Sequence, residues 1–344
     1  MQKTNNKRKG DLKMSKTERN DNETRENTLE KEKKDMMNTM ESFVIKVREA
    51  MEQFYTDCRI ETTEVLKNNN LKLTGLIIRE KGCNVAPSIY LDSFFNQYRA
   101  GRPLAEICNE IIEIYETNKG HHKVDVENFK KFDKMRECIC FKMINAERNM
   151  ELLKDIPHRL YQDLAIVYYA MVLKEEKGTG NIIIRNDMMN LWETDEETLY
   201  EYAKKNTPKL LKGYVRPITQ IIAKYVKDIS VEQSEKSVAE NYEMNISKDE
   251  VMYVVSNANN VNGAATMLYD GIMQEFAEKT GGDFYILPSS THEVIFVPAS
   301  KSIRETELIQ MVREVNETEV ALDEILSGNI YHYHADRGCL GIIR

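Results

Sequence analysis

Residues 284–297 read FYILPSSTHEVIFV, and the pattern of this stretch indicates the kind of fold. Two short apolar runs, Phe284–Leu287 and Glu293–Val297, are rich in β-branched and aromatic residues and flank a polar segment. Such runs, bounded by turn-forming residues, are typical of neighbouring antiparallel strands. We therefore predict two strands joined by a loop at residues 288–292.

Runs of the same kind recur along the chain. The further predicted strands are Ile60–Lys67, Leu71–Arg79, Val85–Leu91, Cys138–Asn145, Tyr161–Leu173, Asn181–Arg185, Val251–Ser256, Gly263–Leu268, Ile330–His334 and Leu340–Ile343. Most neighbours are separated by tight turns, such as Asn262-Gly263 and Asp336–Gly338, which favours antiparallel pairing. This pattern predicts an α+β fold of two lobes, each of mostly antiparallel sheet with packed helices, rather than a doubly wound sheet.

Helical periodicity lies between these runs. The clearest example is an apolar stripe from Leu104 to Tyr115, with Pro103 at a favourable position before it. Apolar stripes predict further helices around residues 43–54, 199–203, 218–225, 272–277 and 308–315.

The charge distribution divides the chain into regions. Residues 1–40 carry a net charge of +3, whereas the remaining residues carry −11. Residues 1–35 hold almost no large apolar side chains, so we expect residues 1–37 to form a disordered basic tail or an extension before a later start. Residues 227–249 are acidic and follow no sustained apolar period, which is typical of a linker. We predict a larger lobe at 38–226 and a smaller one at 250–344.

Composition excludes several classes of protein. Hydrophobic residues make up 41% and charged residues 30% of the 344 residues, which is ordinary for a globular chain. The longest apolar run, Leu164–Leu173, is about half a membrane span, and no apolar core follows the basic N-terminus. We expect a cytoplasmic protein with six reduced cysteines and no membrane contact. The acidic body argues against nucleic-acid binding by the folded part.

Common catalytic signatures are absent from the sequence. It contains no GxGxxG, GxxxxGK[ST], GxSxG, CxxC or HExxH pattern. His292-Glu293 begins like the last of these, but Phe296 stands where the second zinc-binding histidine would be needed. We expect no bound cofactor.

The densest group of reactive side chains lies in the loop between the first two predicted strands. Ser289, Ser290, His292 and Glu293 are the candidate catalytic residues there, because a hydrolase needs a hydroxyl, a base and an orienting group. Adjacent residues seldom reach that geometry. The competing interpretation is a turn whose hydroxyls bind nearby amides.

A second candidate group lies near the C-terminus. His332 and His334 are two apart on a predicted strand and so share one face, and Cys339 follows across the next turn. Three such ligands with an open fourth position would suit zinc, although the spacing matches no standard zinc signature. An exposed strand face of alternating Tyr and His is the competing interpretation. We expect no metal, and we name these three residues as the candidate ligands.

Five motifs together resemble a known family. In chain order they are Asn84–Leu91, Leu152–Arg159, Leu164–Tyr169, Asn206-Thr207-Pro208 and Leu287–Val294. From about Ser42 to Tyr333 the chain resembles domain-of-unknown-function family 5688, which is common in anaerobic Gram-positive bacteria. More weakly, Thr194–Asn206 and Asp283–Val297 resemble domain-of-unknown-function family 1444. The resemblance implies a chain layout and a bacterial cytoplasm. It implies no activity, cofactor or site residue.

These observations support three hypotheses. The leading one is a non-catalytic binding or regulatory module that acts through a protein partner, because no catalytic signature is visible and the body is acidic. The alternative is a small-molecule hydrolase that uses the loop from Ser289 to Glu293. The third is a metal-dependent protein that uses His332, His334 and Cys339.

Overall fold

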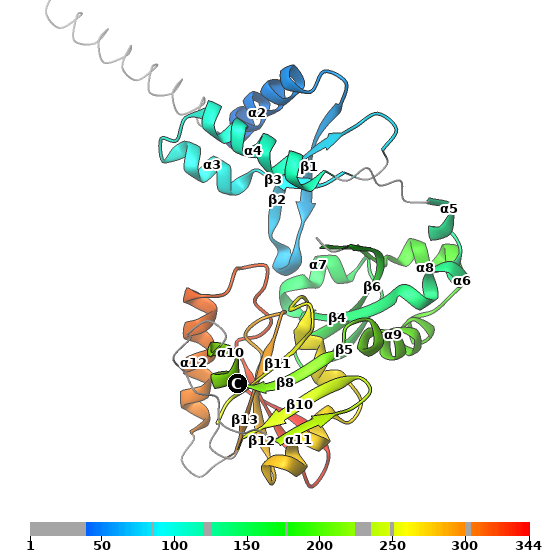
Figure 1. Ribbon diagram of the computed structural model, residues 1–344, viewed down its shortest axis with the longest axis vertical. Coiled ribbons are helices and arrows are strands. Elements are labelled where there is room, and N and C mark those ends of the chain that lie inside the picture. Colours follow the sequence, from blue (N-terminus) through cyan, green and yellow to red (C-terminus); the bar gives the residue numbers. More distant parts are fainter. Residues whose placement is uncertain are drawn as a thin grey trace, which may run out of the picture. The chain divides into compact units, whose positions relative to one another are not determined.

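The computed structural model describes residues 39–83, 86–119, 126–175, 178–223, 235–247, 251–299 and 304–344 (Figure 1). The chain divides into two compact units. Of the described residues, those at 39–65 and 73–119 belong to the first unit, and those at 66–72 and from 126 onward belong to the second. The predicted basic tail, residues 1–37, lies outside the described residues.

The first unit packs three helices on a three-stranded sheet of order β1-β2-β3. Its elements are α2 (Met40–Phe54), β1 (Arg59–Leu66), β2 (Lys72–Arg79), β3 (Ser88–Tyr90), α3 (Asp92–Arg99) and α4 (Leu104–Asn118). Helix α2 begins after Thr39, whose hydroxyl accepts a hydrogen bond from the Ser42 amide at 3.2 Å and so caps the helix. Apolar residues of all three helices meet the sheet in one core. The apolar stripes of α2 and α4 are predicted from their spacing, whereas α3 is not.

The second unit contains a four-stranded sheet, in which β6 pairs with β4, β5 and β7. Its strands are β4 (Ile139–Asn145), β5 (His158–Tyr161), β6 (Leu164–Glu175) and β7 (Gly178–Ile183). The single strand predicted for Tyr161–Leu173 is therefore broken near its start. Gln162 has a φ of 58° there, which turns the chain back and makes β5 and β6 an antiparallel pair.

The second unit also contains an eight-stranded sheet of order β15-β14-β12-β13-β11-β8-β10-β9. Its strands are β8 (Gly213–Pro217), β9 (Glu235–Val238), β10 (Tyr242–Ile246), β11 (Tyr253–Asn257), β12 (Phe284–Leu287), β13 (Val294–Pro298), β14 (Ile330–His334) and β15 (Cys339–Ile343). In this sheet, neighbouring strands pair antiparallel except for β8 and β10, which pair parallel. The α+β class with mostly antiparallel sheets is confirmed.

Helices of the second unit cover and connect these sheets. They are η1 (Asn68–Asn70), α5 (Val126–Phe129), α6 (Phe132–Met135), η2 (Arg136–Cys138), η3 (Glu147–Asn149), α7 (Met150–Leu153), α8 (Asn186–Trp192), α9 (Glu196–Leu210), α10 (Ile218–Ile222), η4 (Gly263–Leu268), α11 (Ile272–Thr280) and α12 (Glu305–Thr318), where η marks a 3₁₀ helix. Within the described residues, no helix combines the length and the apolar character that crossing a bilayer requires.

The compact units divide the chain elsewhere than at the predicted linker. Strand β8 comes from the region predicted as the larger lobe, yet it lies inside the eight-stranded sheet, between β11 and β10. The predicted linker itself contributes β9 and β10. One core also joins Phe141 and Tyr168 of the four-stranded sheet to Phe284 and Phe296 of the eight-stranded sheet. A shared core of this kind makes both sheets parts of one unit.

The segment Gly263–Leu268 corrects one strand prediction, because it forms the 3₁₀ helix η4. Asn262 before it has a φ of 53°, which turns the chain out of the extended conformation. Residues 263–267 are all buried, so no alternation of buried and exposed side chains marks the segment. Continuous burial suits either a strand or a buried turn, and the sequence pattern does not separate them.

Candidate functional site

The loop between β12 and β13 is held in place mainly by backbone hydrogen bonds. The Thr291 amide donates to the Glu324 carbonyl at 2.8 Å, and the Leu326 amide donates to the Ser289 carbonyl at 3.0 Å. The Ser290 hydroxyl accepts from the His292 amide at 3.0 Å, a contact typical of a turn. Glu293 is exposed.

The His292 ring in this loop has partners at both nitrogens. Its Nδ1 accepts a hydrogen bond from the Asn262 amide at 3.2 Å, so the lone pair lies at Nδ1 and the proton of the neutral ring at Nε2. Nε2 lies 3.1 Å from Oε1 of Glu324. Among the described contacts, the structure pairs this imidazole with an amide and a carboxylate and brings no serine hydroxyl to it. Serine activation by His292 would require such a hydroxyl contact.

The second candidate group lies at the end of β14. His332 and His334 lie side by side on one face of the strand, with ring centroids 4.1 Å apart. Cys339 is exposed and lies opposite His334 in the β14–β15 register. In the described residues, however, the three side chains that could share a metal ion are Asp283, His332 and His334. The sequence pattern predicts both histidines as ligands but not Asp283, although Gly281-Gly282 marks the chain turn that precedes it.

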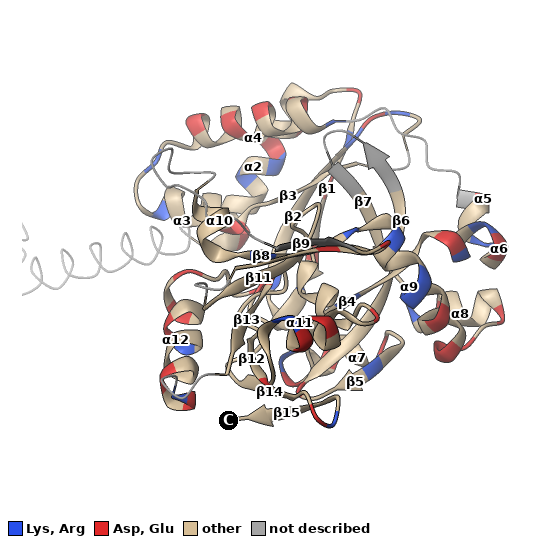
Figure 2. Ribbon diagram, turned by 60° about the horizontal axis from the view of Figure 1, so that its bottom comes forward, with Lys and Arg blue, Asp and Glu red and all other residues tan. Residues whose placement is uncertain are grey.

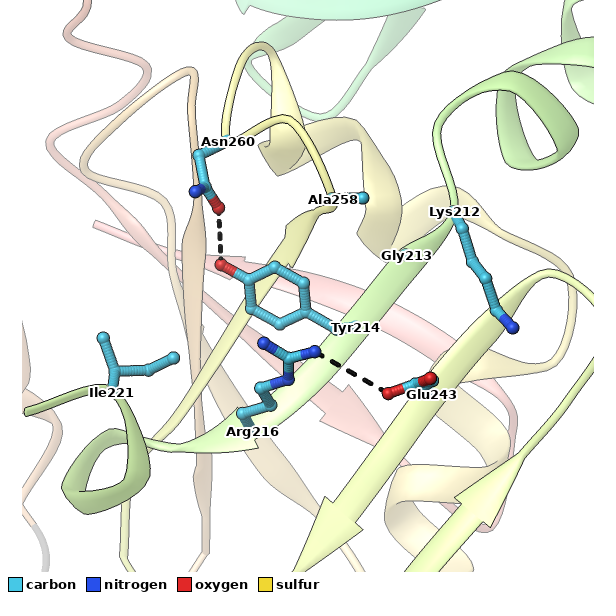
Figure 3. A pocket seen from close by; sticks show the side chains of 8 residues that line it. All are labelled: Lys212, Gly213, Tyr214, Arg216, Ile221, Glu243, Ala258 and Asn260. Carbon is cyan, nitrogen blue, oxygen red and sulfur yellow. Dashed lines mark hydrogen bonds and ion pairs between the residues drawn. The ribbon is translucent and has the colours of Figure 1, made fainter. Parts of the chain in front are cut away.

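A pocket that the sequence analysis did not name lies over β8, with a volume of about 280 Å³. Figure 3 shows the residues that line it, which are Lys212, Gly213, Tyr214, Arg216, Ile221, Glu243, Ala258 and Asn260. Acidic residues recur along α4 and α12 (Figure 2), whereas the pocket is lined by two cationic residues and one acidic residue.

Strand periodicity explains how these residues meet. Alternate side chains of a strand point to opposite faces, so Gly213 and Val215 face the core while Tyr214 and Arg216 face the pocket. Gly213 is required by close packing, because a Cβ atom there would lie 2.5 Å from the Thr266 side chain. Strand β10 runs parallel to β8 and places Glu243 in register with Tyr214.

Arg216 is held on two sides. Its guanidinium carbon lies 4.4 Å from the centroid of the Tyr214 ring, and its Nη2 lies 3.7 Å from Oε2 of Glu243 (Figure 3). The Tyr214 hydroxyl donates to Oδ1 of Asn260 at 2.8 Å, which fixes the ring under which the guanidinium lies. The separation from Glu243 exceeds a hydrogen-bond length. Arg216 and Glu243 are 25% and 29% exposed, so both remain accessible from the pocket.

The pocket therefore offers an oriented guanidinium and one lysine among its lining residues. A guanidinium presents a rigid fork of N–H donors that matches the geometry of carboxylates and phosphates. The sequence carries one usable signal for this pocket, the alternation of Lys212, directly before β8, with Tyr214 and Arg216 within it. Glu243 lay in the segment interpreted as a linker.

The fold and these sites define an α+β protein of two compact units with a small cation-lined pocket. The chain belongs to a family of unknown function (DUF5688), whose model matches residues 40–335. No curated protein and no solved structure matches the chain.

Proposed function

We propose that this chain is a non-catalytic binding module that recognises an acidic group of a protein partner through the pocket over β8. The observation that carries the proposal is the Arg216 guanidinium, oriented by the Tyr214 ring and 25% exposed, whose Nη2 lies 3.7 Å from Oε2 of Glu243, farther than a hydrogen bond.

The size of the pocket supports a side chain as the group that is bound. A volume of about 280 Å³ lies just below the range of about 300–1,000 Å³ that is usual for drug-sized ligands. One acidic side chain, carrying a carboxylate or a phosphate, fits such a volume. Arg216 supplies the directed N–H donors, and Lys212 adds a second positive charge.

Glu243 has an opposing role in this proposal. Its carboxylate lies beside Arg216 and so partly neutralises the positive charge that would attract an incoming anion. It also keeps the guanidinium oriented before the partner arrives. An acidic ligand must therefore compete with Glu243, which favours specific, reversible binding over tight capture.

The hydrolase alternative has less support. It requires a base free to take a proton from a serine hydroxyl, and the His292 nitrogens face the Asn262 amide and the Glu324 carboxylate. If purified protein hydrolyses any substrate, His292→Ala must abolish that activity for the loop at residues 289–293 to be its site.

We also infer that the protein acts in a reducing compartment such as the cytoplasm. The six free cysteines support this inference, because oxidising compartments favour disulfides.

Opposite charge changes in the pocket test the proposed function. Immobilised full-length protein captures partners from a lysate of the source organism, and each captured protein is quantified for the wild type and for two variants. Arg216→Gln should lose the partner, whereas Glu243→Gln should retain or enrich it. Arg313→Gln, at an exposed arginine of α12, is the matched control and should leave capture unchanged. Equal capture by the wild type and Arg216→Gln, or loss through Glu243→Gln alone, would contradict the proposal.

A further inference from the structure

A second site lies apart from the β8 pocket, at the end of the eight-stranded sheet that carries β14. Asp283 directly precedes β12, and the β12–β14 register pairs Tyr285 with His332. Continuing that antiparallel register places Asp283 opposite His334. Since side chains two apart share a face, the carboxylate of Asp283 meets both imidazoles.

The distances within this group suit a shared cation. Oδ2 of Asp283 lies 3.2 Å from Nε2 of His332 and 3.5 Å from Nδ1 of His334. Two ligand atoms at about 2.0–2.1 Å from a tetrahedral zinc ion are about 3.3–3.4 Å apart. All three candidate ligand atoms lie within 4.8 Å of one another, so a small side-chain rotation closes the set.

One polar atom of this group lacks a hydrogen-bond partner among the described residues. Nε2 of His332 is buried and makes no hydrogen bond with any described residue, although Oδ2 of Asp283 is close to it. A buried imidazole nitrogen without a hydrogen bond is costly unless something else occupies its lone pair or its proton. A metal ion bound at Nε2 would do so.

Surrounding contacts orient the ligands as an outer shell does in known metal sites. The Ala335 amide donates to Oδ1 of Asp283 at 2.9 Å, which leaves Oδ2 directed at the imidazoles. The His332 ring stacks on Tyr285, with centroids 4.8 Å apart, and the Tyr285 hydroxyl donates to Glu305 at 3.1 Å. Hydrogen bonds and packing of this kind fix the orientation of metal ligands.

We propose that Asp283, His332 and His334 form a binding site for a divalent transition-metal ion of the zinc type. Two imidazoles and one carboxylate are a ligand set that such ions accept, whereas Ca²⁺ and Mg²⁺ prefer oxygen ligands alone. The three side chains are 20–36% exposed, so ions and water reach the site. Three protein ligands leave at least one coordination position for water or for a donor from a bound molecule.

Zinc titration of the full-length protein, purified without chelator, tests the site. The wild type should bind one Zn²⁺ per chain in competition with a chromogenic chelator. Asp283→Asn keeps an acceptor for the Ala335 amide but removes the charged ligand, and His334→Ala removes an imidazole. Each should weaken zinc binding by more than about tenfold. Cys339→Ser is the matched control and should bind zinc as the wild type does.

Cobalt spectra keep the proposal testable if a variant fails to fold. Co²⁺ bound to the wild type should give ligand-field bands of a nitrogen- and oxygen-coordinated ion without a thiolate charge-transfer band. Zinc binding by Asp283→Asn equal to that of the wild type would overturn the proposal. So would loss of binding through Cys339→Ser, or a thiolate band in the cobalt spectrum, because either result would make Cys339 a ligand.

Discussion

Replacing Gly263 with alanine tests whether the loop at residues 288–292 is held by close packing. A Cβ atom at this position would lie 2.0 Å from Oγ of Ser256, 2.4 Å from the His292 carbonyl oxygen and 2.9 Å from the Asn257 amide nitrogen. Ser256 is fully buried and donates its hydroxyl to the same His292 carbonyl at 2.7 Å. The added methyl group therefore meets two backbone atoms and a hydrogen-bonded side chain.

The expected loss of stability follows from these contacts. Rotating Ser256 away would break a buried hydrogen bond, which costs about 1 kcal/mol. The backbone atoms of His292 and Asn257 belong to the loop and to β11, so they yield only by displacing those elements, and overpacking of this kind costs about 1–3 kcal/mol. We expect Gly263→Ala to lower the free energy of unfolding by about 2–4 kcal/mol.

Urea unfolding followed by tryptophan fluorescence measures this change in the right part of the chain. The single tryptophan, Trp192, belongs to the same buried cluster as Ala264 and Ala265. With a slope of about 1–3 kcal/mol per molar urea, the midpoint should fall by about 0.7–4 M. Gly328→Ala is the matched control, because nothing lies within 4 Å of its Cβ position. A Gly263→Ala midpoint within error of the wild type would refute the packing argument.

Three further predictions concern buried groups. Asp163 accepts hydrogen bonds from Ser327, Asn329 and the buried Tyr331. Asp163→Ala should therefore lower the free energy of unfolding, measured in urea, by about 2–4 kcal/mol. A loss below about 0.5 kcal/mol would contradict this. Burial raises the pKa of the Cys140 thiol to about 12, whereas Cys339 is exposed. Iodoacetamide at pH 8 should therefore modify Cys339 well before Cys140, because the thiolate is the reacting form. Peptide mass spectrometry measures both rates, and equal rates would contradict this. Burial also raises the pKa of several tyrosines above the ordinary value of about 10. These groups lose their protons in the unfolded chain before they do so in the folded protein, so the folded state is favoured less as pH rises. The free energy of unfolding should therefore fall as pH rises above about 10. Absorbance at alkaline pH should show these tyrosines ionising only as the protein unfolds, and early ionisation of all tyrosines would refute it. They include Tyr168, Tyr169 and Tyr331.

Much of the local structure was predictable from the sequence. Strand β14 has the predicted bounds, Ile330–His334, because Ile330, Tyr331 and Tyr333 are buried in a regular extended run. Helix α4 begins at Leu104 as the apolar stripe predicts, and its buried residues lie on that stripe. The strands that flank the loop at residues 288–292 are confirmed as an antiparallel pair. Each of these elements carries its own period and its own boundary residues.

Other features depend on long-range contacts that no local pattern encodes. Strand β8 is short, and its place at the centre of the sheet depends on pairing with β10 and β11, which lie 25 or more residues further along the chain. The charge of Glu243 suggested a linker, whereas in the fold that charge faces the pocket and Arg216. Asp283 joins the two histidines only through the β12–β14 register, which sequence spacing does not reveal.

Equilibrium titration with small acidic probes tests most directly whether the pocket over β8 binds an acidic group. N-acetyl-phosphoserine and N-acetylaspartate carry the two proposed anionic groups, and N-acetylserine is the uncharged control. We expect the acidic probes to bind the wild type, Arg216→Gln to weaken their binding by at least about tenfold, and Glu243→Gln to strengthen it. Equal affinity of the wild type and Arg216→Gln, or equal binding of the uncharged probe, would contradict it.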